Sequence, residues 1–437
     1  MSSGNKLWSK AGTSTSQLIE TFTVGRDKDF DVLLAEYDVL GSLAHTEMLA
    51  SVGLLSREDF ALVKEGLTTI LGEIRAGSFV IDADVEDVHS QVELLLTNRI
   101  GEAGKKIHSG RSRNDQVAVD IKLYLRAEVL ALKEEVAKLF DLLIGLSDQY
   151  KDKLLPGYTH LQIAMPSSFG LWFGAYAESL VDDLEVLAAA YQVANKNPLG
   201  SGAGYGSSFP LDRELTTRLL HFRTLNVNSV YAQMSRGKTE KIVAMGLAAV
   251  AATLSKLAMD CCLYINQNFN FISFPPELTT GSSIMPHKKN PDVFELIRGK
   301  CNRIQSTPNE LTLLINNLPS GYHRDLQLTK EILFPALEEG KACLRMTQLM
   351  LSQIEIKDGI LEDEKYRYLF SVEAVNELVN QGVPFREAYK QVGNQIDQGQ
   401  FHFDHKKGLH HTHTGSIGNP GNAAITAEMK RVLAKFE

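Results

Sequence analysis

The sequence predicts an almost all-α protein built around long helices. Helical periodicity dominates the 437 residues, whereas alternating strand patterns bounded by turns are scarce. No glycine or proline interrupts residues 117–144, so a helix there could extend about 40 Å at 1.5 Å per residue. A helix of that length is typical of a helical bundle.

Further long helices are expected at about residues 167–194, 238–268, 292–315 and 326–353. The second of these carries several small residues, which imply close packing on more than one side: Ala248, Ala251, Ala252 and Ala258. Its apolar run, residues 242–254, is shorter than the ~20 residues that cross a bilayer. We interpret this stretch as a fully buried core helix in the middle of a bundle or at a subunit interface.

The chain is too long for a single hydrophobic core, and two loop-rich junctions divide it, near residues 101–111 and 356–364. We therefore expect three domains. These are an N-terminal helical domain (1–110), a central domain of long bundled helices (111–355) and a C-terminal helical domain (356–437).

Composition excludes several classes of function. With 44% apolar and 22% charged residues, the chain is typical of globular proteins, and its formal net charge of -8 argues against nucleic acid or an anionic membrane as a partner. The first residues lack the apolar core of a secretory signal, so a cytoplasmic location is expected. The four cysteines have neither zinc-site nor redox-pair spacing, and we interpret them as reduced thiols.

The segment Gly281–Pro291, GSSIMPHKKNP, carries the most chemical information. It is typical of a mobile loop that leads into a helix, because Pro291 suits an early helical position. Lys288 and Asn290 would then lie beside the positive end of the helix dipole, where a carboxylate is stabilised. An ordinary polar loop with exposed lysines is the alternative for a generic stretch of this composition.

Two further motifs precede long helical stretches. Gly157–Gln162 reads GYTHLQ, and a histidine in such a loop is more often structural than catalytic. Ser109–Gln116 reads SGRSRNDQ, which offers helix-capping residues but also an arginine and an asparagine suited to a second carboxylate.

Together these motifs resemble the superfamily of fumarase, aspartase and argininosuccinate lyase, and the SRNDQ form resembles its argininosuccinate lyase branch. The resemblance implies that Ser282 is the catalytic base and that Lys288 and Asn290 hold the substrate carboxylate. It implies that Thr159 contacts substrate while His160, paired with Glu295, protonates the leaving nitrogen. It assigns the remaining positions to substrate binding: Arg113 and Asn114, then Tyr322, Gln327 and Lys330 for an arginine portion, and Asp87 and His89 near the mobile end of the substrate.

The implied reaction is the reversible elimination of fumarate from argininosuccinate to leave arginine. Removal of a proton beside a carboxylate creates a doubly charged aci-carboxylate, so a fixed cation such as Lys288 is needed. Ser282 is a weak base unless dehydration and nearby positive charge help it to lose its proton. Neither a cofactor nor a metal is implied.

The resemblance also implies a fold of three α domains and a homotetramer in which three subunits build each active site. Two segments depart from the family pattern. Ser9–Gly12 stand where the family usually has Gly-Gly-Arg-Phe, and Thr23–Asp29 differ from an Asn-Ala-Ser segment that contacts substrate. That contact is assigned to no residue here.

Several other interpretations remain. The chain could be another fumarate-forming lyase of the adenylosuccinate lyase or aspartase type, or a non-catalytic structural homologue like the δ-crystallins. Gly200–Gly206 has glycine spacing without the strand that a dinucleotide site needs, so we interpret it as a loop lining the cleft. The C-terminal histidines are interpreted as a surface loop and not as a metal site: His402, His405, His410, His411 and His413.

Overall fold

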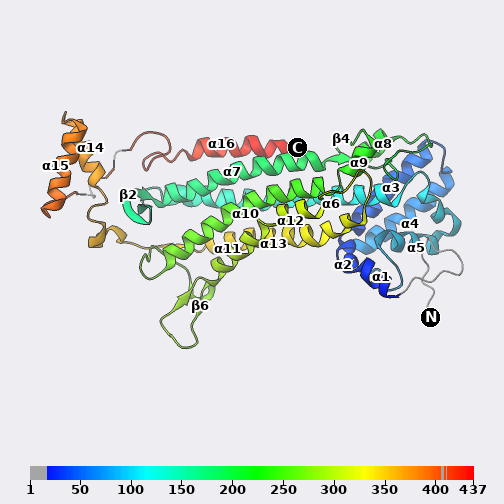
Figure 1. Ribbon diagram of the computed structural model, residues 1–437, viewed down its shortest axis with the longest axis horizontal. Coiled ribbons are helices and arrows are strands. Elements are labelled where there is room, and N and C mark those ends of the chain that lie inside the picture. The colour runs from blue at the N-terminus through cyan, green and yellow to red at the C-terminus, as the bar shows by residue number, and fades with distance from the viewer. Residues whose placement is uncertain (1–16, 405–407, 410) are drawn as a thin grey trace.

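The computed structural model describes residues 17–404, 408–409 and 411–437. Its long helices run side by side along an elongated molecule (Figure 1). They are α6 (Arg113–Gln149), α7 (Phe169–Ala194), α10 (Lys238–Ile265) and α13 (Thr329–Leu351). The prediction of an almost all-α protein with a central bundle of long helices is confirmed.

Helix α6 extends beyond the predicted range in both directions and contains 37 residues. It begins at a capping box, in which Ser112 and Asp115 satisfy each other's backbone N–H groups. Its buried face repeats at intervals of three and four residues, through Leu125, Val129, Leu132, Val136 and Leu139. Each such side chain contributes about 1.5–3 kcal/mol when it is removed from water, so one face of α6 anchors the bundle.

Helix α10 contacts α7, α11, α12 and α13, as expected for a helix in the middle of the bundle. It is long and apolar enough to cross a membrane by length and composition, and 56% of its most apolar window is buried inside the fold. Met245 and Met259 on its outer face are 45% and 40% exposed. The prediction of a fully buried helix therefore holds for one face only.

The predicted helix at 292–315 is replaced by two helices, α11 (Asp292–Ile304) and α12 (Thr307–Leu314). The break falls just before Pro308, which has no N–H group to continue the helical hydrogen bonds but is tolerated in the first turn of a new helix.

Two hairpins project from the bundle. The hairpin of β1 (Leu154–Thr159) and β2 (Gln162–Ser168) was not predicted, and its register pairs Thr159 with Gln162. The second, β6 (Thr280–Gly281) with β7 (Lys289–Asn290), forms the base of the serine-rich loop. The other short pairs are β3 (Lys196–Asn197) with β4 (Thr224–Leu225), and β5 (Ile272–Ser273) with β8 (Glu355–Ile356).

The N-terminal part has a small core of its own between α3 (Ala35–Ser51), α4 (Arg57–Arg75) and α5 (Val88–Ile100). Two short helices, α1 (Gln17–Val24) and α2 (Asp27–Asp31), precede it, and α2 contacts α13. Helices α8 (Arg213–Leu219) and α9 (Ser229–Met234) lie at the same end of the molecule (Figure 1). This arrangement brings α1 to α5, α8, α9 and the start of α13 to one end of the bundle.

The region assigned to a C-terminal domain, 356–437, occupies two places. Helices α14 (Ser371–Asn380) and α15 (Phe385–Asp397) form a small separate cluster, whereas α16 (Asn422–Leu433) returns along α7 (Figure 1).

The 3₁₀ segments are η1 (Val32–Leu34), η2 (Gly101–His108), η3 (Pro276–Leu278), η4 (Arg324–Leu328), η5 (Ile360–Glu362), η6 (Glu364–Tyr366) and η8 (Ala434–Phe436).

Candidate active site

The residues predicted to form the site lie in three separate places within the chain. Seven of them line a cavity of about 610 Å³ at the α2 end of the bundle: Asp87, His89, Arg113, Asn114, Tyr322, Gln327 and Lys330. The serine loop carries Ser282, Lys288 and Asn290, with Glu295 on α11. Thr159 and His160 lie on the β1–β2 hairpin, at the other end of the bundle from α2 (Figure 1).

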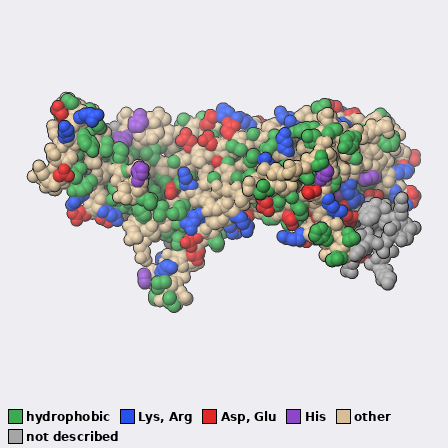
Figure 2. All heavy atoms as spheres, in the orientation of Figure 1, with side chains coloured by type: hydrophobic (Ala, Val, Ile, Leu, Met, Phe, Trp, Pro, Cys, Tyr) green, Lys and Arg blue, Asp and Glu red, His purple; other side chains and the backbone are tan. Residues whose placement is uncertain are grey.

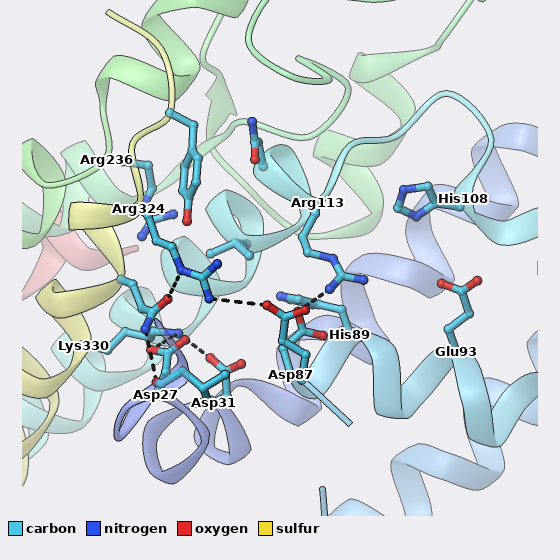
Figure 3. Close-up of a pocket in the computed structure, with 16 residues that line it drawn as sticks. Asp27, Asp31, Asp87, His89, Glu93, His108, Arg113, Arg236, Arg324 and Lys330 are labelled. Carbon is cyan, nitrogen blue, oxygen red and sulfur yellow. Dashed lines mark hydrogen bonds and ion pairs between the residues drawn. The ribbon is translucent and has the colours of Figure 1, made fainter. Parts of the chain in front are cut away.

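The cavity is built where the N-termini of α5 and α6 face each other. Asp87 caps α5 and accepts a hydrogen bond of 2.8 Å from the Ser90 N–H group. Its second carboxylate oxygen contacts Arg113, whose guanidinium also donates to Ser90 Oγ at 3.2 Å. Burial alone would raise the pKa of Asp87, but the charges of His89 and Arg113 and the Ser90 hydrogen bonds hold it below its usual value. Asp87 therefore stays ionised and fixes the direction of Arg113 (Figure 3).

The glycine-rich loop at 200–206 supports the start of α6. The N–H groups of Gly200 and Gly202 donate to Asp115 Oδ2 at 2.9 and 3.0 Å, while Asp115 Oδ1 accepts from Ser112 N. Burial raises the pKa of Asp115 to about 6 in spite of these donors. The loop thus binds a carboxylate of its own chain, and it holds the helix that carries Arg113.

His89 connects the cavity to a buried acidic network. Its Nδ1 atom lies 2.9 Å from Asp38 Oδ1 and 3.5 Å from Asp120 Oδ2. Burial would raise the pKa of Asp38, but the charge of His89 and hydrogen bonds from His89 and Gln116 Nε2 hold it below its usual value. Burial raises the pKa of Asp120 well above its usual value. The ring of His89 is therefore fixed by polar partners on its inner side.

The segment η4 and the start of α13 supply the opposite wall of the cavity. Gln327 Nε2 donates to the carbonyl oxygens of Thr23 and Val24 at 3.1 and 3.3 Å. Lys330 is almost fully buried and bonds to both Asp27 and Asp31. Burial would lower the pKa of Lys330, but the two carboxylates outweigh it and keep the ammonium charged.

Sequence reasoning missed several charged residues that line the same cavity: Asp27, Asp31, Glu86, Glu93, His108, Arg236 and Arg324. Arg324 Nη2 reaches the Thr23 carbonyl and Glu86, at 3.1 and 3.4 Å. Burial lowers the pKa of His108 to about 4, so its imidazole is neutral at pH 7. Two of these charged residues lie beside predicted ones in the sequence, since Glu86 precedes Asp87 and Arg324 lies between Tyr322 and Gln327. Asp27 lies in Thr23–Asp29, the segment that differs from the family pattern and forms a wall of the cavity.

The serine loop projects from the body of the molecule (Figures 1 and 2). Ser282 is partly exposed, and its Oγ atom accepts hydrogen bonds from the N–H groups of Ile284 and Met285 at 3.3 and 3.1 Å. Asn290 immediately precedes Pro291, the N-cap of α11, whereas Lys288 is exposed to solvent. The expected position beside a helix N-terminus is thus found for Asn290, with Lys288 two residues before it.

The hairpin presents His160 in an uncommon backbone conformation. His160 and Leu161 have φ angles of 52° and 58°, which is the geometry of a type I′ two-residue turn that asparagine and glycine usually occupy. Both side chains are exposed. His160 and Glu295 make no hydrogen bond to each other in the described part of the chain, so their expected pairing does not form within one subunit.

Comparison with known proteins decides the family. A protein-family profile described as Lyase matches residues 10–306. The argininosuccinate lyase of Bacteroides fragilis (strain YCH46) is 58% identical over 431 residues, which cover 99% of this chain and 96% of that protein. That of Stenotrophomonas maltophilia (strain R551-3) is 37% identical and covers 96% of each.

The chain belongs to the argininosuccinate lyase family. It is therefore an enzyme of the lyase class, and the predicted relationship is confirmed.

Solved structures confirm the fold. EDDS lyase in complex with formate superposes with a TM-score of 0.74 at 22% identity, over 97% of this chain and 91% of that one. Class II fumarase from Schistosoma mansoni gives 0.71 at 14% identity, over 87% and 91%. The predicted fumarase/aspartase-like architecture is thus correct for this argininosuccinate lyase family member.

The C-terminal histidines are only partly within the described structure, because His405 and His410 lie outside it. His411 Nε2 lies 3.1 Å from Glu373, and its ring stacks on that of His413. Among the described residues, the group with metal-ligand spacing is instead Asp38, His89 and Asp120. His89 and Gln116 already bond to Asp38, whereas neither carboxylate oxygen of the buried Asp120 has a hydrogen-bond partner in the part of the chain that the structure describes, and the nearer one lies 3.5 Å from His89.

Proposed function

We propose that this chain splits argininosuccinate reversibly into arginine and fumarate, as a step of arginine biosynthesis in the cytoplasm. Ser282 removes the proton beside the succinate carboxylate, and Lys288 and Asn290 stabilise the resulting aci-carboxylate. His160, oriented by Glu295, protonates the leaving nitrogen directly or through water. Two candidates, Thr159 and Asn114, bind substrate in this scheme.

One observation carries the proposal most directly, namely the surroundings of Ser282 Oγ. A serine hydroxyl is a weak base because its alkoxide is costly in water. Two backbone N–H groups, of Ile284 and Met285, already point at this oxygen. Such fixed donors stabilise negative charge more than mobile water does when the site closes, so they favour loss of the serine proton.

The cavity suits the arginine portion of the substrate. Tyr322, Gln327 and Lys330 line one wall, and Arg113 and Asn114 line the other at the N-terminus of α6. In Figure 2, acidic and basic side chains intermix over this end of the molecule. A ligand with a cationic guanidinium and several carboxylates requires such mixed charge.

We further propose that the active site assembles between subunits of a homotetramer. The hairpin with His160, the serine loop and the charged cavity are too widely separated in one chain to act on one substrate (Figure 1). The bundle also exposes apolar side chains that a partner could cover, among them Met245, Leu296, Leu313 and Leu349.

The first experiment tests the activity. Purified protein is mixed with argininosuccinate, and fumarate is followed by absorbance while arginine is measured in parallel. Equal release of both products, abolished in Ser282→Ala, is expected. A folded protein that releases no fumarate from argininosuccinate but releases it from adenylosuccinate or aspartate would assign another fumarate-forming activity. Inactivity with all three would favour a structural homologue.

A second experiment tests assembly of the site. The Ser282→Ala and His160→Asn variants are each expected to be inactive. The two proteins are dissociated into subunits, mixed and allowed to reassociate. If Ser282 and His160 of one site come from different subunits, random mixing restores about a quarter of the wild-type activity. Half of the sites receive an intact Ser282, and half of those also receive an intact His160. If both residues come from one chain, the hybrids stay inactive.

A further inference from the structure

Asp27 is the first residue of α2, and its side chain lines the charged cavity. Helix α2 contacts α13, which carries Lys330. The segment Thr23–Asp29 is therefore a wall of this cavity and not a remote surface.

The charges around Lys330 do not balance. Lys330 Nζ lies 2.8 Å from Asp27 Oδ1 and also bonds to Asp31. One ammonium group thus faces two carboxylates, which leaves one unit of negative charge in excess. The side chain of Asp31 is 4% exposed, whereas that of Asp27 is 17% exposed. The excess charge therefore lies on the side that opens into the cavity.

The other cations of the cavity have acidic partners of their own among the described residues. Arg113 is bound to Asp87 and Arg324 to Glu86. Arg236 pairs with Glu240 at 3.0 Å, with both side chains buried. The burial of Asp27 raises its pKa to about 6, although Lys330 opposes the change. A partly buried carboxylate in this position is stabilised when a ligand brings a further positive charge.

We infer that Asp27 and Lys330 together bind the α-amino-acid end of the arginine portion, with the α-ammonium group on Asp27 and the α-carboxylate on Lys330. The inference rests on the proposed function. The pair places a negative and a positive group side by side, which matches the zwitterion of an amino acid. Fumarate carries no cation, so it gains nothing from Asp27. Asp27 is thus a specificity-determining residue for the amino-acid product.

The test compares ligands that lack one end of the zwitterion. Arginine, 5-guanidinopentanoate (without the ammonium) and agmatine (without the carboxylate) are titrated calorimetrically into wild type and Asp27→Asn. For Asp27→Asn we expect about tenfold or greater loss of affinity for arginine and agmatine, because a charge-assisted hydrogen bond is removed. The affinity for 5-guanidinopentanoate should change less than about threefold.

The matched control is Asp29→Asn, since Asp29 lies two residues away with a side chain that is 68% exposed and 3.8 Å from Arg26. It should bind all three ligands like wild type. A purely structural role for Asp27 would weaken all three ligands alike, or none, and either result would overturn the inference. Wild-type fumarate release is measured separately, so an inactive wild type that still binds arginine would refute the proposed reaction without deciding the role of Asp27.

The kinetic readout is independent of calorimetry. In the reverse direction, Asp27→Asn should raise the KM for arginine about tenfold or more and leave the KM for fumarate within about threefold. Equal increases in both KM values would contradict a contact with the α-ammonium group.

Discussion

The hydroxyl groups of Tyr158 and Tyr366 lie 3.1 Å apart and join the His160 hairpin to the segment that follows the bundle. Tyr158 is two residues before His160 on β1, and its ring also meets Phe269 edge-on at 5.2 Å. Tyr366 is 2% exposed. Burial raises the pKa of Tyr158 and of Tyr366, so both phenols remain protonated at neutral pH. The hydrogen bond therefore anchors a hairpin whose turn residues have unusual φ angles.

Replacing Tyr366 by phenylalanine should slow turnover without weakening substrate binding. The change removes one hydrogen bond, worth about 1 kcal/mol, and gives the hairpin more freedom, so kcat should fall about fivefold with KM unchanged. Steady-state fumarate release measures both constants. Tyr368→Phe is the matched control, because Tyr368 lines a second cavity beside the hairpin together with Tyr158 and Tyr366, but its hydroxyl group is not bonded to Tyr158. Equal kcat values for the two variants would show that the hydroxyl pair does not position His160.

Arg113 should not tolerate lysine. Its planar guanidinium contacts Asp87 and donates to Ser90 Oγ while it faces the cavity, and lysine lacks that fork of donors. The KM for argininosuccinate should rise about 10- to 100-fold for Arg113→Lys, as expected for a lost hydrogen bond to a charged group. Arg99→Lys is the control, since Arg99 pairs with Glu73 on the surface of the N-terminal part. A KM for Arg113→Lys within about twofold of the wild-type value would show that Arg113 does not bind the substrate.

The long helices could be predicted because their pattern is local. Residues 117–144 contain no helix breaker, and the buried positions recur every three or four residues. The break before Pro308 obeys a local rule, since proline is tolerated in the first turn of a helix and not in its interior. The turn at His160 and Leu161 gave little local signal, because it lacks the asparagine and glycine that usually mark a type I′ turn.

The charged cavity could be predicted only in part. Arg113 and Lys330 were found through motifs, but the partners that define their chemistry lie far away in sequence. Asp31, for example, is 299 residues from Lys330. Pairings of this kind depend on how helices pack, and no short pattern around either residue encodes them.

Acid should destabilise the protein partly through His45. Burial lowers its pKa to about 3, and its Nε2 atom bonds to the Ser109 carbonyl at 2.8 Å. The unfolded chain takes up a proton at His45 below about pH 6.5, whereas the folded chain does not until about pH 3. The unfolded state therefore binds more protons in this window, and the stability present above pH 6.5 is lost as the pH falls.

His45→Gln should reduce that pH dependence while keeping a donor for Ser109. Between pH 6 and 4, the free energy of unfolding of His45→Gln should fall less steeply with falling pH than that of the wild type. The two slopes should differ by up to about 1.4 kcal/mol per pH unit, the value for one proton. Urea unfolding at fixed protein concentration measures both slopes. Parallel slopes for the two proteins would mean that His45 is protonated in the folded state.

The serine loop should close over bound substrate, and trypsin can detect this. The loop projects into solvent with Lys288 and Lys289 exposed, and a two-residue ladder and the Thr280 contact with Asp292 hold its base. Cleavage after these lysines should be rapid in ligand-free Ser282→Ala, which cannot consume substrate. With argininosuccinate at about ten times its Kd, the open population and thus the cleavage rate should fall about tenfold.

Mass spectrometry of the fragments separates this cut from others. Cleavage after Lys430, which lies within α16 away from the loop, is the internal control and should not respond to substrate. Protection at both places would indicate general stabilisation by the ligand. Rapid cleavage after Lys288 with the site saturated would contradict closure, because a loop that stays accessible to a protease cannot exclude the water that makes Ser282 a weak base.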